Sequence, residues 1–121
     1  MAYQNYKSLG TLLAASSLTG SQYLFAKVDS AGKIAVAGAG ELAIGVIENK
    51  PGAGEPVTVA IYGVIKVKAG ATFAAGAKIA ANAAGKAITA TTGQQINGIA
   101  LEAAGAVDQV VSVLLVRAGV A

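Results

Sequence analysis

The segment VTVAIYGVIKVK, residues 57–68, decides the fold, because its large apolar side chains recur at every second position. Valine or isoleucine occupies positions 57, 59, 61, 65 and 67, and the alternate positions include Thr58, Lys66 and Lys68. A β-strand points successive side chains to opposite faces, so this pattern turns one face to a core and the other to water. The segment therefore predicts β structure with one apolar face and one wet face.

The chain after residue 20 has the pattern of further short strands between turns. Turn signals such as Asp29-Ser30-Ala31-Gly32 and Lys50-Pro51-Gly52-Ala53-Gly54 bound the apolar runs. The predicted strands are Tyr23–Val28, Lys33–Val36, Ala43–Glu48, Lys78–Ala81, Ile88–Thr91, Ile96–Leu101 and Val110–Val116. Many short strands separated by Gly-rich turns are typical of all-β domains. We therefore predict an all-β fold, a small β-barrel or β-sandwich-like single domain.

The two halves of the chain resemble copies of one strand-rich unit. Ala31-Gly32-Lys33 recurs 53 residues later as Ala84-Gly85-Lys86, and Gly45 recurs as Gly98. With the same offset, Gly52-Ala53 matches Gly105-Ala106 and Val57 matches Val110. A single offset for turns and apolar runs indicates a duplicated supersecondary unit. We expect one domain with an internal pseudo-repeat.

The composition argues against an enzyme. The chain has no Cys and no His, so thiolate nucleophiles, imidazole bases and the usual Zn or Cu ligands are absent from the sequence. The six acidic residues have no base, nucleophile or metal partner at a telling spacing. We expect no catalytic residues, no metal site and no cofactor.

The charges point away from nucleic acid and from membranes. The net charge is +3, and the nine basic residues are scattered singly, whereas nucleic-acid binders cluster them. The uncharged stretch between Lys7 and Lys27 is broken by Ser, Thr, Gly and Gln, so it does not predict a membrane span. Only 12% of the residues are charged, which indicates apolar surface hidden between subunits and hence a homo-oligomer.

The first 20 residues have no sustained strand period. They contain Tyr3 and Tyr6, and tyrosines favour interfaces because they bring contact area at low entropic cost. We predict an N-terminal arm over residues 1–20, ordered on binding, followed by a β-rich domain over residues 21–121. The alternative is that the arm folds back as an edge strand of its own domain.

A carrier domain is a second reading of part of the chain. The segment GVIKVKAGATFAAG, residues 63–76, is similar to the later half of biotinyl or lipoyl carrier domains. Those domains need a lysine at a hairpin tip, and Lys50 lacks the Met or Asp neighbours they use. A carrier, or another small β-barrel binding module, remains the alternative function, and a mass shift on lysine would reveal a carrier.

Several weak Gly/Val motifs occur in a telling order over residues 20–119. They are GVI at 45–47, GEPVTVA at 54–60, GVIKV at 63–67, GAKI at 76–79, INGIALE at 96–102 and the closing run 111–116. This order resembles the small capsid cement, or decoration, proteins of tailed bacteriophages. The resemblance implies a β-rich structural virion protein on the outer capsid surface that is assembled in the host cytoplasm. It implies that the protein binds the major capsid protein and stabilises its lattice, as a trimer or, in some related architectures, a dimer.

The interface is expected to use the aromatic residues near the N-terminus and the closing strand. Residues 110–116 are apolar on both faces, so we expect the core to cover one face and a neighbour to cover the other. The expected interface residues are Tyr3, Tyr6, Tyr23, Phe25, Val111, Val113 and Leu115.

Overall fold

The computed structural model describes residue 2 and residues 4–121, and its regular elements in this part of the chain are all β-strands. The strands are β1 (Asn5–Leu9), β2 (Phe25–Val28), β3 (Ile34–Val36), β4 (Gly45–Ile47), β5 (Val59–Lys68), β6 (Lys78–Ala81), β7 (Ala87–Thr89), β8 (Gly98–Ala100) and β9 (Val110–Leu115). They form one antiparallel sheet in the order β3-β2-β4-β5-β9-β8-β6-β7, with β1 on β5. The all-β prediction is confirmed, and the continuous sheet corresponds to an open barrel.

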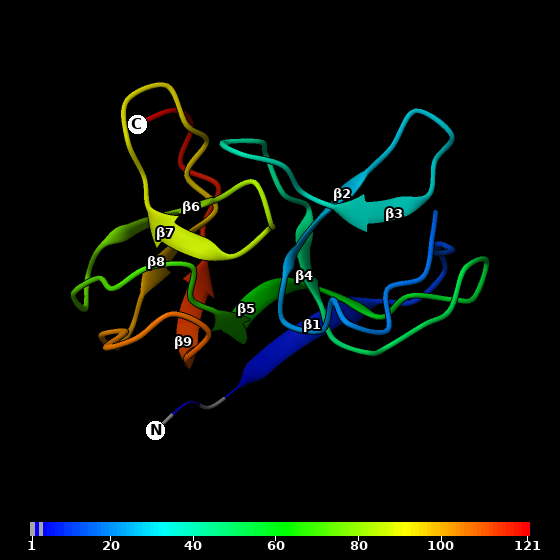
Figure 1. Ribbon diagram of the computed structural model, residues 1–121, viewed down its shortest axis with the longest axis horizontal. Helices are drawn as coiled ribbons and strands as arrows, with labels where there is room; N and C mark the ends of the chain where they lie inside the picture. Colours follow the sequence, from blue (N-terminus) through cyan, green and yellow to red (C-terminus); the bar gives the residue numbers. More distant parts are fainter. Residues whose placement is uncertain (1, 3) are drawn as a thin grey trace.

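Strand β5, the alternating segment from the sequence, joins the two halves of the sheet (Figure 1). Val64 pairs with Asn5 of β1 and with Leu114 of β9, so these two strands lie on opposite edges of β5. Ala60 pairs with Ser8 of β1 and with Val46 of β4. Strands β4 and β9 therefore follow one another along the same edge of β5, and β1 covers the other.

The internal repeat is present in the backbone. We call residues 12–61 the first repeat and residues 67–115 the second repeat. The pairs Phe25↔Val46 and Ala26↔Gly45 in the first repeat recur as Lys78↔Ile99 and Ile79↔Gly98 in the second. Each residue of the second repeat lies 53 positions after its counterpart in the first, as the sequence predicted.

The hairpin turns of the two repeats have the same chemistry. Asp29 Oδ1 accepts hydrogen bonds from the backbone N–H groups of Ala31 and Lys33, both at 2.9 Å. In the second repeat, Asn82 Oδ1 accepts from Ala84 and Lys86, again at 2.9 Å. Gly32 and Gly85 follow with φ of 77°, a left-handed conformation that favours glycine.

The predicted match of Val57 with Val110 is wrong by one residue. Val46↔Ala60 in the first repeat corresponds to Ile99↔Leu114 in the second. Val46 and Ile99 are 53 positions apart, whereas Ala60 and Leu114 are 54 positions apart. The turn before β9 is one residue longer than the turn before β5, and the left-handed residue Gly54 there corresponds to Asp108. The structural counterpart of Val57 is therefore Val111.

The segment before residue 20 belongs to the fold, which corrects part of the arm prediction. Strand β1 pairs with β5 through Tyr6↔Gly63 and Lys7↔Tyr62. Ala14 and Leu18 are buried in the smaller core cluster, with Ile34, Ile47, Val57 and Val59 among their neighbours. Sequence periodicity missed β1 because its first four residues are exposed and provide no apolar alternation. The predicted domain boundary after residue 20 does not coincide with a break in packing.

Candidate functional site

Four of the predicted interface residues lie in the core of the subunit. Phe25, Val111 and Val113 are fully buried and Leu115 is nearly so, all within the larger core cluster. Strand β9 lies between β5 and β8, so strands of the same chain flank it on both edges. On its other face Ser112 is buried too, and only Leu114 is exposed among the residues of that strand. The expectation that these four residues meet a neighbouring subunit is therefore corrected.

The structure brings two of the predicted tyrosines together, and Tyr3 lies outside the described residues. Tyr6 on β1 is 36% exposed, and Tyr23 is half-buried just before β2. Glu48 lies near both of them. Burial and the nearby Glu48 carboxylate raise the pKa of the Tyr6 hydroxyl.

Glu48 is the most perturbed acid in this group. Its two carboxylate oxygens are buried and have no hydrogen-bond partner within the part of the chain that the structure describes. Burial raises the pKa of Glu48 to about 7, although the nearby Tyr6 hydroxyl and the Lys66 charge act in the opposite direction. Glu48 is therefore partly protonated at neutral pH.

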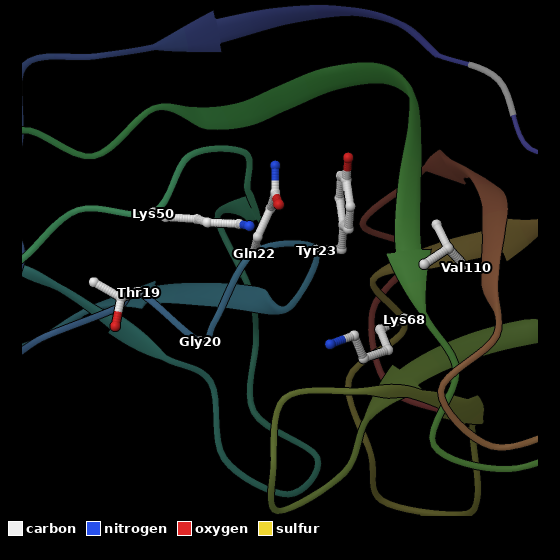
Figure 2. A pocket seen from close by; sticks show the side chains of 7 residues that line it. All are labelled: Thr19, Gly20, Gln22, Tyr23, Lys50, Lys68 and Val110. Atoms are coloured by element: carbon white, nitrogen blue, oxygen red, sulfur yellow. The ribbon is translucent and has the colours of Figure 1, made fainter.

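An open depression of about 360 Å³ lies beside this group (Figure 2). Figure 2 shows Lys50, Lys68 and Tyr23 around it, from three separate parts of the chain. The other lining residues are Thr19, Gly20, Gln22 and Val110. Gln22 is held in place by a 2.8 Å hydrogen bond from its side-chain amide to the carbonyl oxygen of Glu48. The lining has two ammonium groups and no carboxylate, so it suits an acidic side chain of a partner.

Tyr23 at the edge of the depression has an unusual backbone. Its φ is 68°, whereas the structurally equivalent residue of the second repeat is Gly76, with φ of 85°. The equivalence follows from the hydrogen bonds Tyr23 N–H to Ile47 and Gly76 N–H to Ala100, which match across the repeats. A bulky residue in the left-handed region is strained, and such strain tends to be kept where a side chain has a function.

The arrangement supports binding rather than chemistry. The described residues contain no cluster of acidic, His or Cys side chains that could hold a metal ion. They also contain no helix long and apolar enough to cross a bilayer. The sequence singled out Lys50 as a turn residue and as the lysine of the carrier alternative, and no local pattern marked Lys68 or Glu48 as site residues. The signal that could have found them is three-dimensional, because Tyr23, Lys68 and the segment 48–50 are distant in sequence and come together only in the folded chain.

Comparison with known families decides the relationship. The profile of the phage cement protein family matches residues 22–115. The chain belongs to the phage cement protein family. It is thus a structural, capsid-associated protein of a bacteriophage, and the family resemblance predicted from the Gly/Val motifs is confirmed.

A solved structure has the same fold as this cement protein. It is the N base of the head fiber gp8.5 of bacteriophage phi29, with a TM-score of 0.71 and 18% sequence identity. The match covers 97% of this chain and 99% of the other. A search of curated protein sequences found no match. At this identity the structural likeness concerns the fold.

Proposed function

We propose that this cement protein binds the outer surface of the assembled phage capsid, contacts the major capsid protein and stabilises its lattice without performing chemistry. Family membership over residues 22–115 is the observation that carries the proposal. The absence of Cys and His from the sequence supports a purely structural role. A protein that binds only the closed lattice stabilises it by mass action against opening.

The depression with Lys50 and Lys68, together with Tyr6 and Tyr23, is the proposed capsid-binding face. Tyrosines supply anchoring area, and the two lysines supply charge for acidic side chains of the capsid. The strained Tyr23 supports this choice, because the second repeat has a glycine at the same place. Contact of the N-terminal segment with the capsid, predicted from Tyr3 and Tyr6, belongs to the same proposal.

The oligomer proposed for the capsid is a homotrimer, with a dimer as the alternative. Several modest contacts made at once by a symmetric oligomer give avidity that a single subunit lacks. Neither nucleic acid nor a membrane is among the proposed partners, and the protein is proposed to join the head in the host cytoplasm.

Charge reversal tests the proposed face. Lys50→Glu combined with Lys68→Glu should abolish co-sedimentation with capsids, because a carboxylate pair would then repel acidic partner groups. The matched control is Lys33→Glu with Lys78→Glu, which changes the net charge equally at two exposed sites outside the depression. Equal loss of binding in both pairs would mean that overall charge, rather than this face, attracts the capsid.

A second measurement separates lattice stabilisation from mere attachment. Particles decorated with the wild-type protein should release their genome at a higher temperature than stripped particles. Particles that bind the protein but open at the same temperature would leave it a display or surface-masking role. A mass shift on a lysine of the native protein would instead favour the carrier alternative.

A further inference from the structure

The contact between the two repeats shows how one repeat holds another. The loop at Gly40 of the first repeat lies on the second repeat. Gly40 donates its backbone N–H to the carbonyl oxygen of Ala81 at 2.9 Å, and its own carbonyl accepts from the N–H of Gln95 at 3.1 Å. Ala81, a member of the larger core cluster, is fully buried and Gln95 is half-buried. The second repeat thus has a seat, formed by Ala81 and Gln95, that the Gly40 loop fills.

The equivalent seat on the first repeat is open and apolar. The counterparts of Ala81 and Gln95, 53 residues earlier, are Val28 and Leu42, which are 41% and 52% exposed. Both line an open groove of about 520 Å³. The rest of its lining is Leu9, Leu12, Ala43, Ile44, Ile61 and Arg117.

Arg117 contributes a positive charge to the wall of this groove. Its guanidinium donates hydrogen bonds to the carbonyl oxygens of Ala43 at 3.1 Å and Ile61 at 3.2 Å, and also to that of Ile44. These bonds fix the side chain against the first repeat. Apart from this charge the lining is aliphatic, which suits an apolar segment.

The chain also carries the matching insert, on its second repeat. The counterpart of Gly40 is Gly93, in the exposed and uncharged loop Thr91–Gly93. The C-terminal segment runs beside this loop, because Val120 forms a bridge with Gln95 and the carbonyl of Ala121 accepts the N–H of Gly93 at 3.0 Å. Val120 is 57% exposed. The Gly93 loop and Val120 together form a knob with an apolar tip and no charged side chain.

We propose that the groove lined by Val28 and Leu42 in one copy seats the Gly93 loop and Val120 of a second copy, in a head-to-tail contact. The internal contact is its template for placement only: Gly93 would lie over Val28 and Leu42 as Gly40 lies over Ala81 and Gln95, without the hydrogen bond that the Gly40 N–H donates. The new contact relies on apolar side chains, since the N–H of Gly93 is already bonded to Ala121 of its own chain. A second copy is the fitting partner because its second repeat has, 53 residues after Gly40, the counterpart of the loop that fills the equivalent place within the chain.

The orientation of the hairpins supports head-to-tail rather than two-fold packing. In Figure 1 the turn between β6 and β7 points toward the first repeat, whereas the turn between β2 and β3 points away from the second. Accordingly Gly85 is buried, and its carbonyl accepts the N–H of Phe25 at 2.8 Å, while Gly32 is exposed. A heterologous contact of this kind generates a ring or an open chain of copies. The proposed trimer corresponds to closure after three copies, but the contact itself does not depend on that number.

Two variants, each damaging one side of the contact, provide the test. Leu42→Lys damages the groove and Val120→Lys damages the knob, and each should weaken self-association of the isolated protein about tenfold or more. Val107→Lys is the control, because Val107 is 58% exposed but belongs to neither surface. Association is followed by sedimentation velocity, and circular dichroism checks that each variant has the wild-type fold.

Mixing the two variants distinguishes this contact from all others. Each variant retains one intact surface, so the mixture should form a 1:1 heterodimer that grows no further. A wild-type chain that stays monomeric at its solubility limit, or variants that associate like Val107→Lys, would overturn the proposal. Association lost in both variants but not restored in the mixture would point to an isologous contact and would also overturn it.

Cysteine cross-linking gives an independent readout, because the chain has no cysteine of its own. Leu42→Cys and Val120→Cys, mixed and oxidised, should form a disulfide between unlike copies in preference to like copies. Leu42→Lys that lowers capsid binding but leaves association unchanged would assign the groove to the capsid protein and refute the self-contact. Loss of capsid binding by the Lys50 and Lys68 reversal leaves this outcome unaffected, so the two proposals fail separately.

Discussion

The two repeats have the same backbone plan and different surroundings. Both contain an Asx-type turn, with Asp29 in one and Asn82 in the other, and both turns end in a left-handed glycine. Yet Gly85 is buried against the first repeat, where a Cβ would overlap Val36, and Gly32 has open space around it. The comparison teaches that local turn chemistry sets the shape of each unit, whereas the neighbours decide which copy of a surface is covered.

The first repeat has acquired features that the second lacks. Strand β1 covers its part of β5, Tyr23 stands where the second repeat has Gly76, and Glu48 stands where it has Leu101. These three differences cluster around the proposed capsid-binding face. The second repeat instead has the Lys86–Asp108 ion pair at 2.6 Å, in which Lys86 lowers the pKa of Asp108. The positions at which the two repeats differ are therefore those that the shared fold does not require, and in the first repeat they lie at the proposed capsid-binding face.

The largest expected effect tests whether the equivalent glycines of the two repeats, Gly45 and Gly98, are equally tightly packed. An added Cβ at Gly45 would overlap the carbonyl oxygen of Ala60, and at Gly98 it would lie 2.5 Å from Val113 Cγ1 and 2.8 Å from the Leu114 carbonyl oxygen. Gly45→Ala and Gly98→Ala should each lower the free energy of unfolding by about 3 kcal/mol. Gly45→Ala should be the more costly of the two, since its Cβ would overlap backbone atoms more deeply than the Cβ of Gly98→Ala would.

Urea denaturation measures this difference. Gly10→Ala serves as the control, because a Cβ there has nothing within 4 Å. If Gly45→Ala and Gly10→Ala unfold at the same urea concentration, the β4–β5 and β8–β9 junctions are not the tight equivalents described above.

An intermediate effect concerns β1, which only the first repeat possesses. Deleting residues 2–8 removes most of a strand that pairs with β5 from Val59 to Val64. The isolated protein should lose on the order of 2 kcal/mol of stability, because backbone N–H and C=O groups of β5 would lose their hydrogen-bond partners. Thermal unfolding without capsids measures this loss.

Tyr6→Ser distinguishes the contribution of the aromatic side chain from that of the β1 backbone pairing. This variant keeps the backbone pairing of β1, so it should unfold near the wild-type temperature and bind capsids more weakly. An unchanged melting temperature after the deletion would restore the hypothesis of an arm that is ordered only on the capsid.

The smallest expected effect is a pH dependence from Glu48, the acid that replaces Leu101 of the second repeat. Its pKa is about 7 in the folded chain, against a usual value of 4.5, so the folded state binds more protons than the unfolded state between these values. Stability should therefore fall as pH rises from about 4.5 through 7 and stay lower above that range. Glu48→Gln, which cannot ionise, should exceed the wild type at pH 8 by on the order of 1–2 kcal/mol.

The gap between Glu48→Gln and the wild type should close as the pH approaches about 4.5. Glu55→Gln changes the net charge by the same amount at an exposed site and is the control. Parallel pH profiles for the wild type and Glu48→Gln would mean that the Glu48 carboxyl is solvated in solution.

Much of the fold could be predicted from residues whose signal is local. The alternation in residues 57–68 corresponds to β5, and the Asp29 turn and its repeat at Ala84-Gly85-Lys86 occur where the sequence placed them. The exposed strand β1 could not be found, because edge pairing depends on backbone groups and leaves little mark on side chains. The interface prediction for Phe25, Val111, Val113 and Leu115 was wrong because apolar side chains look the same whether their own sheet or another subunit buries them.

The sequence by itself determined the strand class, the turn positions and the duplication, since alternation, Asx side chains and glycines act over a few residues. It also determined family membership through the order of its Gly/Val motifs. Only the tertiary structure decided that Lys50, Lys68 and Tyr23 line one depression and that the Glu48 carboxylate is buried. It also decided that Val28 and Leu42 are exposed, whereas Ala81, the counterpart of Val28, is buried. These outcomes depend on which distant segments pack together, because the burial and the charge environment of a side chain are set by its neighbours in space and not by its neighbours in sequence.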